Sequence, residues 1–270
     1  MSARTMCRIK NTQRIFSATR PLLILVLILL SQNVQAELKL CLAEADFPPF
    51  TFKVDVASSE YKGYTVELIE YVSTHLERPI VIRKFPWKRC LFLLERGEVD
   101  IVADAYHDVQ RAKKFYYSRP YYKMTPQFYY DQRVFPDGFP HASGPVSLPE
   151  YRGCGIQGYS YEHYGPGYNR LIKSASSLVQ LFWQLARKRC DYVVEELEIV
   201  EGVNLLGPSI IDLSNIKHAR PESARSPELH FIYSKDRAID AKIIADINVA
   251  IQSFINSGQA SKVMEKLMRP

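Results

Sequence analysis

Short apolar runs alternate with amphipathic stretches along the chain from residue 38 onward. Leu38–Leu42 has the pattern of a buried strand, and the apolar residues of 66–76 recur at helical spacing behind Thr65, a residue type that caps helix N-termini. Residues 80–83 fit a second strand. This order predicts a strand, a helix and a further strand that pairs with the first.

The alternation continues beyond residue 83. The pattern predicts a helix over residues 88–96 that ends at Gly97, because glycine accepts the left-handed conformation common after a helix C-terminus. The apolar residues 99–103 then predict a strand. Such a series indicates an α/β fold with a mainly parallel sheet, in which ligands bind at the carboxyl ends of the strands.

A second α/β series follows a stretch rich in Pro and Gly at 134–150, which is typical of a surface excursion. Residues 153–156 predict a strand, Ser177 and Gln180 form a capping box that begins a helix, and residues 192–194 predict the next strand. The pattern closes with a strand over 229–233 and helices over 238–255 and 261–268. Two such series in one chain predict two lobes with a cleft between them.

The first 36 residues have a different character. Five basic residues and no acidic residue surround or precede the apolar run Leu22–Leu30, and a small-residue segment ends at Ala36. This is the layout of a secretory signal peptide, so we expect cleavage near Ala36 and a periplasmic mature chain. A membrane anchor is the alternative, although the apolar run is short for a membrane span. Met6 is an alternative start of the chain.

The charge of the chain is concentrated in this leader. The formal net charge is +6, but residues 37–270 hold 30 basic and 29 acidic residues once the five basic residues of the leader are set aside. The mature chain therefore lacks the positive charge expected of a nucleic-acid-binding protein, and we expect no nucleic-acid partner.

Four cysteines follow the leader, at positions 41, 90, 154 and 190. None forms a C-x-x-C motif, which favours one or two disulfides over a zinc site. Cys154 and Cys190 begin two strands that we expect to be neighbours, so they are candidates for one bridge. Four buried thiols remain the alternative.

Enzyme motifs are missing or out of context. Gly153–Gly158 matches G-x-G-x-x-G, but the motif itself has the pattern of a strand, and no acidic residue follows about twenty positions on, so we expect no dinucleotide site. The chain has no G-x-S-x-G, H-E-x-x-H or Walker motif. We expect no cofactor, no metal site and no catalytic residue.

Four segments together resemble a known family. They are Ala45–Phe52 after the first strand, Pro86-Trp87, the run from Gly97 through Arg111 to Tyr122, and Asp191 after a second helix. Their order resembles the bacterial family 3 extracellular solute-binding proteins, whose members bind polar amino acids for ABC importers. The resemblance covers essentially all of residues 37–270 and is more specific in the first half.

The resemblance implies a two-lobed periplasmic-binding-protein type II fold, with two α/β lobes joined by two crossover strands. It places lobe 1 at 37–130 plus 228–270 and an inserted lobe 2 at 131–227. It also implies that the lobes close on the ligand like a hinge and that the protein is a monomer.

The resemblance also implies ligand-binding residues. Arg111 matches the family's arginine that binds an α-carboxylate, and Phe47 and Trp87 match aromatic residues that stack on the ligand. Ser160 matches a hydroxyl position at a strand end of the second lobe, and Glu44 matches a position often acidic in binders of basic amino acids. Taken without the resemblance, Arg111 is a solvated arginine and the two aromatic residues are core.

Three other candidate positions fit the family's pattern less well. Glu196 matches an acidic residue that binds the ligand's α-ammonium group, but it also belongs to an acidic run that is typical of a solvated turn. Asp104 and Tyr106 stand where amino-acid binders have small hydroxyl residues, so we expect a bulkier and more acidic pocket. If Asp104, Glu44 and Glu196 all face the cleft, they favour a cationic ligand.

The sequence thus predicts a non-enzymatic protein that captures a small polar, amino-acid-like solute for an ABC permease. One alternative is a sensory protein that delivers a solute signal to a membrane receptor. Another is a lyase-like enzyme on the same scaffold, with Glu196 or Asp104 as the general acid or base.

Overall fold

A computed structural model describes residues 36–53, 60–140, 149–207, 211–237 and 239–269. The contacts divide the chain into residues 1–36 and a compact unit, 37–270, to which the elements below belong. The signal peptide expected for residues 1–36 lies outside the described residues, apart from Ala36. In the described ranges, no helix is long and apolar enough to cross a membrane.

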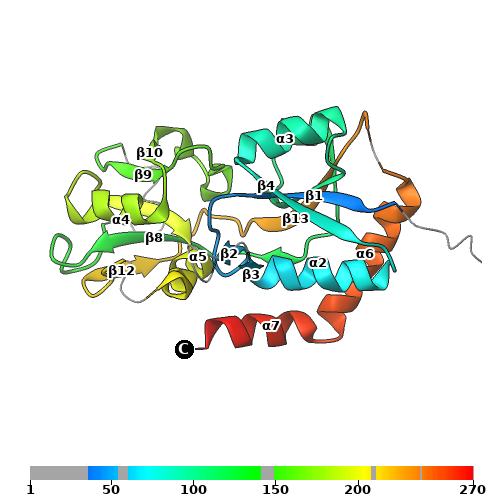
Figure 1. The fold of residues 1–270 in the computed structure, drawn as a ribbon. Coiled ribbons are helices and arrows are strands. Elements are labelled where there is room, and N and C mark those ends of the chain that lie inside the picture. Colours follow the sequence, from blue (N-terminus) through cyan, green and yellow to red (C-terminus); the bar gives the residue numbers. More distant parts are fainter. Residues whose placement is uncertain (1–35, 54–59, 141–148, 208–210, 238, 270) are drawn as a thin grey trace, which may run out of the picture. The chain divides into compact units, whose positions relative to one another are not determined.

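The first sheet is mixed rather than mainly parallel. Its order is β4 (Ile80–Phe85), β1 (Leu38–Ala43), β5 (Ile101–Tyr106), β13 (Glu228–Ser234) and β6 (Phe115–Tyr117), with β7 (Tyr122–Lys123) also on β13. Strand β1 pairs in parallel with β4 and β5, whereas β13 is antiparallel to its neighbours. The helices of this part are α2 (Tyr64–His75), α3 (Trp87–Arg96), α6 (Ala241–Asn256) and α7 (Gln259–Met268) (Figure 1).

The second sheet repeats this plan. Its order is β10 (Ile172–Ala175), β9 (Gly153–Ile156), β11 (Tyr192–Glu196), β8 (Pro126–Asp131) and β12 (Ile216–Ala219), and its helices are α4 (Leu178–Ala186) and α5 (Leu197–Gly202). Strand β9 is parallel to β10 and β11, and β8 is antiparallel to β11 and β12. A small separate hairpin joins β2 (Phe52–Lys53) and β3 (Tyr61–Lys62).

Strand β8 bears on the expected boundary between the lobes. Its residues 126–131 are hydrogen-bonded within the second sheet, while the sequence places residues up to 130 in the first lobe. We therefore propose that the second lobe begins before β8. Strand β13 returns the chain to the first sheet, close to the expected second boundary at residue 228.

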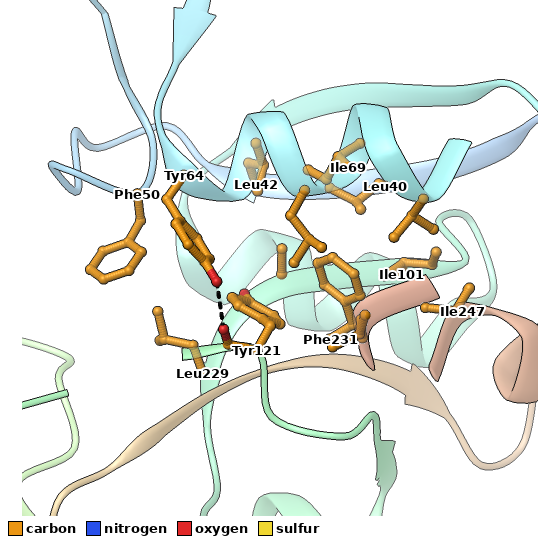
Figure 2. Packing of buried hydrophobic residues seen from close by; sticks show 14 of the residues in the cluster. Leu40, Leu42, Phe50, Tyr64, Ile69, Ile101, Tyr121, Leu229, Phe231 and Ile247 are labelled. Carbon is orange, nitrogen blue, oxygen red and sulfur yellow. Dashed lines mark hydrogen bonds between the residues drawn. The ribbon is translucent and has the colours of Figure 1, made fainter. Parts of the chain in front are cut away.

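Helix α2 contributes much of the first core. It buries Tyr64, Leu68, Ile69 and Val72 against the sheet, and the Tyr64 hydroxyl donates a hydrogen bond of 2.7 Å to the Tyr121 carbonyl (Figure 2). The helix begins two residues earlier than expected. Its N-cap is glycine at position 63, with φ of 129°, where a side chain would overlap the Phe50 carbonyl.

Thr65 is therefore not the N-cap of α2. It lies inside the helix, fully buried, and its hydroxyl donates a hydrogen bond of 2.7 Å to Asp104 Oδ1. The threonine thus connects α2 to the end of β5, and a polar residue that sequence reasoning assigned to capping instead holds a carboxyl group.

The other predicted helix ends are confirmed. Helix α3 ends at Gly97, which adopts the left-handed conformation with φ of 70°. The Ser177 hydroxyl caps α4 by accepting a hydrogen bond of 3.2 Å from the Gln180 N–H. The return contact of the capping box goes one residue further back than expected, because Gln180 Oε1 accepts from the Ser176 N–H at 2.6 Å.

Each sheet carries one disulfide. Cys154 and Cys190 are bridged, which confirms the expected pair beside the parallel strands β9 and β11. Cys41 of β1 is bridged to Cys90 of α3. The alternative of four free thiols is wrong in this structure.

The G-x-G-x-x-G segment forms strand β9 as predicted. Its glycines have a packing role, since a Cβ at Gly153 would overlap the Tyr192 ring and one at Gly155 would lie 2.7 Å from the Tyr161 ring. Absence of a side chain at both positions lets large tyrosine rings lie directly on the strand.

Candidate functional site

A cavity of about 280 Å³ lies where strands of both sheets end. It is lined by the segments that follow the carboxyl ends of β1, β5, β9 and β10, the place where open parallel sheets bind ligands. The lining residues include seven of the eight positions predicted from the sequence: Glu44, Phe47, Trp87, Asp104, Tyr106, Arg111 and Ser160. They come from segments far apart in the chain and form one candidate site.

Arg111 begins the short 3-10 helix η1 (Arg111–Lys113) that follows β5. Its backbone N–H donates a hydrogen bond of 2.7 Å to Asp108 Oδ1. The guanidinium Nη1 donates 2.7 Å to the Tyr106 carbonyl, and the guanidinium carbon lies 5.4 Å from the centre of the Trp87 ring. A guanidinium has five N–H donors, so this fixed side chain keeps donors for a carboxylate in the cavity.

Asp104 sits at a backbone bend near the end of β5. Its φ of 58° is left-handed, a conformation that aspartate tolerates better than most residues. Oδ1 accepts hydrogen bonds from Thr65 Oγ1 at 2.7 Å and from the Tyr121 hydroxyl at 2.9 Å. Burial raises the pKa of this carboxyl, against the opposing effect of these donors and of Lys84.

Lys84 lies close to this acidic group. Burial lowers the pKa of Lys84 to about 8, while the carboxylates of Asp104 and Asp46 act in the opposite direction. The ammonium nitrogen lies 3.4 Å from the centre of the Tyr61 ring and 3.4 Å from the carbonyl of Ala43, a residue that lines the cavity. The first-sheet side of the cavity therefore combines a half-buried carboxyl with a nearby cation.

Aromatic rings form the walls of the site. Phe47 faces Tyr159 edge to face with ring centres 6.5 Å apart, and Trp87 carries Arg111 on its ring face. Tyr106 contacts the His163 ring edge to face at 5.6 Å. The Tyr106 hydroxyl is buried and has no hydrogen-bond partner among the described residues, and burial, followed by the nearby Glu196 and Glu195, raises its pKa.

Glu196 does not line the cavity, contrary to its expected role as a ligand contact. It is 1% exposed at the end of β11, and its Oε1 lies 2.7 Å from His163 Nε2. Burial raises the pKa of Glu196, but the hydrogen bonds from His163 and Glu195 outweigh it and the net pKa is lowered. In this arrangement His163 occupies the carboxylate that a ligand ammonium group would need.

Glu195 is the buried partner of this pair. It is fully buried, its Oε2 has no hydrogen-bond partner among the described residues, and its Oε1 accepts 3.2 Å from the Glu196 N–H. Burial, with the Glu196 carboxylate beside it, raises the pKa of Glu195 well above its ordinary value. The expected solvated acidic turn is thus a buried acid pair in the second sheet.

Several lining residues were not predicted from the sequence. Thr51 brings its hydroxyl to 3.5 Å from Asp104 Oδ2, and Gln157, Tyr159 and Ser176 line the second-sheet side. Tyr159 directly precedes the predicted Ser160 and follows Gly158, whose φ is 86°. A glycine after a buried strand was the available signal for this turn into the cavity. Nothing local in the sequence identified His163 as the partner of Glu196.

The sequence matches the pattern of one protein family over residues 40–270: the bacterial extracellular solute-binding proteins, family 3. A match of this length covers both sheets and the whole candidate site. The chain therefore belongs to this family, as its motifs predicted, and the family consists of binding proteins. A comparison with curated protein sequences gives no match.

Solved structures of other proteins show the same fold. A substrate-binding protein of an amino acid ABC transporter is 19% identical over 87% of this chain and 100% of its own, with a TM-score of 0.67. An amino acid ABC transporter substrate-binding protein from Streptococcus pneumoniae, bound to L-arginine, is 18% identical over 86% and 94%, with a TM-score of 0.65.

A third similar structure has a different biological setting. A histidine kinase sensor domain with similarity to periplasmic binding proteins is 19% identical over 88% of this chain and 98% of its own, with a TM-score of 0.69. At these identities the likeness is one of fold. The chain has the two-lobed α/β fold of periplasmic binding proteins, as predicted.

Proposed function

We propose that the protein captures a small polar, amino-acid-like solute in this cavity, in the periplasm, for import by an ABC permease. The observation that carries the proposal is Arg111, which is fixed on the Trp87 ring at a cavity at the carboxyl ends of both sheets. A planar fork of donors in a partly desolvated, aromatic-walled cavity suits a ligand carboxylate.

Asp104 and Glu44 provide the acidic side of the proposed site. Both line the cavity, whereas Glu196 is paired with His163, so we assign the ligand's cationic group to Asp104 and Glu44. A cation beside Asp104 would offset the burial that raises the pKa of this carboxyl. Ligands with one carboxylate and one cationic group are therefore the preferred class.

Thermal unfolding tests the proposal. The purified protein, refolded once to remove bound solute, is scanned against amino acids, polyamines, dipeptides and organic acids. A ligand at a hundred times its Kd adds about 2.7 kcal/mol, which corresponds to a rise in Tm of roughly 5–10 °C for a chain of this size.

Two variants make the result specific to the site. Arg111→Ala is expected to abolish the shift, and Arg89→Ala, an exposed arginine outside the cavity lining, is expected to keep it. Stabilisation that survives in Arg111→Ala would contradict carboxylate capture at this residue. If neutral or acidic solutes bind and no cationic ligand does, the assignment of the ligand's cationic group to Asp104 and Glu44 is wrong.

A sensory role is the second candidate, favoured by the similarity to a histidine kinase sensor domain. Capture and release of a solute would then signal to a membrane receptor instead of feeding a permease. Solute uptake by cells that lack the gene separates the two: lost uptake supports import, and unchanged uptake with a lost transcriptional response to the ligand supports sensing.

A further inference from the structure

Helix α4 exposes apolar side chains on the face that does not pack on the second sheet. Leu181, Phe182 and Leu185 are buried against the sheet, while Val179 is 43% exposed and Trp183 is 42% exposed. Val179 and Trp183 are four residues apart and so lie on one side of the helix. The helix packs on strands β8, β9, β10 and β11 of the second sheet (Figure 1).

Arginines bracket the exposed tryptophan. The guanidinium carbons of Arg187 and Arg189 lie 5.0 and 4.7 Å from the centre of the Trp183 ring, and both arginines are exposed. Lys188 stands between them at the C-terminal end of α4. We call Val179, Trp183 and residues 187–189 the α4 patch.

Basic residues predominate around the α4 patch, although Lys188 is close enough to Asp131 to lower the pKa of that carboxyl and Asp191 follows Cys190 in the chain. Residues 163–190 contain five basic residues and no acidic residue, although residues 37–270 as a whole are nearly balanced. Neither Arg187 nor Arg189 forms a salt bridge within the described residues. The patch therefore presents an aromatic ring among uncompensated guanidinium groups, and an anionic surface is its electrostatic complement.

Helix α3 provides a natural comparison. Its Phe92 is 45% exposed and lies under Arg89 and Arg96 at 5.0 and 5.4 Å. There, however, Arg96 pairs with Glu98 at 2.5 Å. The two helices share an arginine-flanked aromatic ring, but among the described residues the arginines that flank Trp183 form no salt bridge.

We propose that the α4 patch docks the protein on an anionic phospholipid bilayer. A tryptophan flanked by arginines, with a further apolar residue on the same side, is the composition of an interfacial membrane contact. Arginine and lysine bind the lipid phosphates, and the Trp183 ring enters the headgroup region. This docking is independent of the solute bound in the cavity and would hold the protein near the membrane.

Vesicle co-sedimentation tests the proposal. The protein is expressed with its own leader, purified from the periplasm, and checked by mass spectrometry for its N-terminus. It is mixed at ~0.1 M salt with vesicles of phosphatidylglycerol and phosphatidylcholine, or of phosphatidylcholine alone. We expect the protein to sediment with the vesicles that contain phosphatidylglycerol and not with those of phosphatidylcholine. We expect this binding to be lost at ~1 M salt, where charges are screened.

Variants then test which residues contact the vesicle surface. Arg187→Gln with Arg189→Gln is expected to lower the partition coefficient about thirtyfold, and Trp183→Ser about tenfold. Phe92→Ser on α3 is the matched control and is expected to leave binding unchanged. All these residues are exposed, and circular dichroism melting confirms that each variant is folded.

Three results would overturn the proposal. They are no binding to anionic vesicles, equal binding by the Trp183 variant and wild type, and equal loss in Phe92→Ser. Light scattering tests whether the α4 patch binds a second copy of the chain instead of a membrane. Self-association that disappears in Trp183→Ser would identify the α4 patch as a contact between two copies of the chain.

Discussion

Glu195 and Glu196 are neighbours in the chain and are both buried, yet their carboxyl groups differ in pKa. Burial raises the pKa of Glu195, which keeps its proton at pH values where an ordinary glutamate has lost it. For Glu196, the hydrogen bonds from His163 and Glu195 outweigh the effect of burial and lower the pKa. Glu195 therefore keeps its proton to higher pH than an ordinary glutamate, and Glu196 loses its proton at lower pH.

This difference predicts opposite outcomes for two isosteric substitutions. Glu196→Gln removes a charge-assisted hydrogen bond to His163 and is expected to lower the Tm by about 2–8 °C at pH 7. Glu195→Gln replaces a protonated carboxyl with an amide of the same shape and is expected to change the Tm by less than about 2 °C. Differential scanning calorimetry of the two variants measures both shifts.

The effect of Glu196→Gln also has a predicted pH dependence. Because the folded-state pKa of Glu196 lies below its ordinary value of 4.5, its contribution is full above pH 4.5 and is lost as the pH falls through the folded-state pKa. The Tm difference from wild type is therefore expected to shrink below pH 4.5. A difference that stays constant as the pH falls through this range would contradict the assigned charge of Glu196.

The candidate site residues differ in how far local sequence could identify them. Arg111, Trp87 and Phe47 were candidates because their segments resemble the motifs of the family, and all three line the cavity. Glu196 was a candidate for the same reason, but its side chain pairs with His163, which is 33 residues away. Such a pairing depends on tertiary packing and leaves no local pattern.

At the scale of elements, helix α4 connects the cavity with the proposed docking surface. Its N-terminal cap, Ser177, follows Ser176, which lines the cavity, and its C-terminal end carries Arg187 of the α4 patch. The helix is short, so its stability depends on its cap and on the buried residues Leu181 and Leu185.

The N-cap residue of α4, Ser177, leads to a prediction about the stability of this helix. Ser177→Ala leaves the Gln180 N–H without its acceptor and is expected to cost about 1 kcal/mol, or roughly 2–4 °C in Tm. Ser177→Thr is the matched control, because threonine keeps a hydroxyl that can accept the same hydrogen bond at the N-cap. Thermal unfolding of the two variants decides: equal losses would mean that the serine hydroxyl does not act as a cap.

The elements that the sequence predicted are those whose apolar residues recur at a regular helical or strand spacing. Helices α2, α3, α4, α6 and α7 and strands β1, β4, β5, β9, β11 and β13 all appear near their expected positions. The missed strands β2, β3, β6, β7, β8, β10 and β12 lack such a signal. All of them except β8 are only two to four residues long, and β8 and β12 pair in antiparallel fashion with partners distant in the chain. Tertiary pairing, and not local pattern, defines these strands.

At the scale of the whole unit of residues 37–270, the two sheets have the same strand plan. In each, a strand that begins the series lies between two parallel neighbours, and an antiparallel strand follows. This repetition brings the carboxyl ends of β1 and β5 and of β9 and β10 to one cavity. The proposed capture of a solute in this cavity would therefore involve segments of both sheets.

Calorimetric titration of the solute that gives the largest thermal shift tests this claim most directly. Wild-type protein, Arg111→Ala and Arg89→Ala are titrated under the same conditions. Loss of the fixed guanidinium leaves a ligand carboxylate unpaired in a partly desolvated site, so Arg111→Ala is expected to weaken binding at least about a hundredfold. Arg89→Ala is expected to match wild type. Equal affinities for all three proteins would contradict solute capture at this cavity.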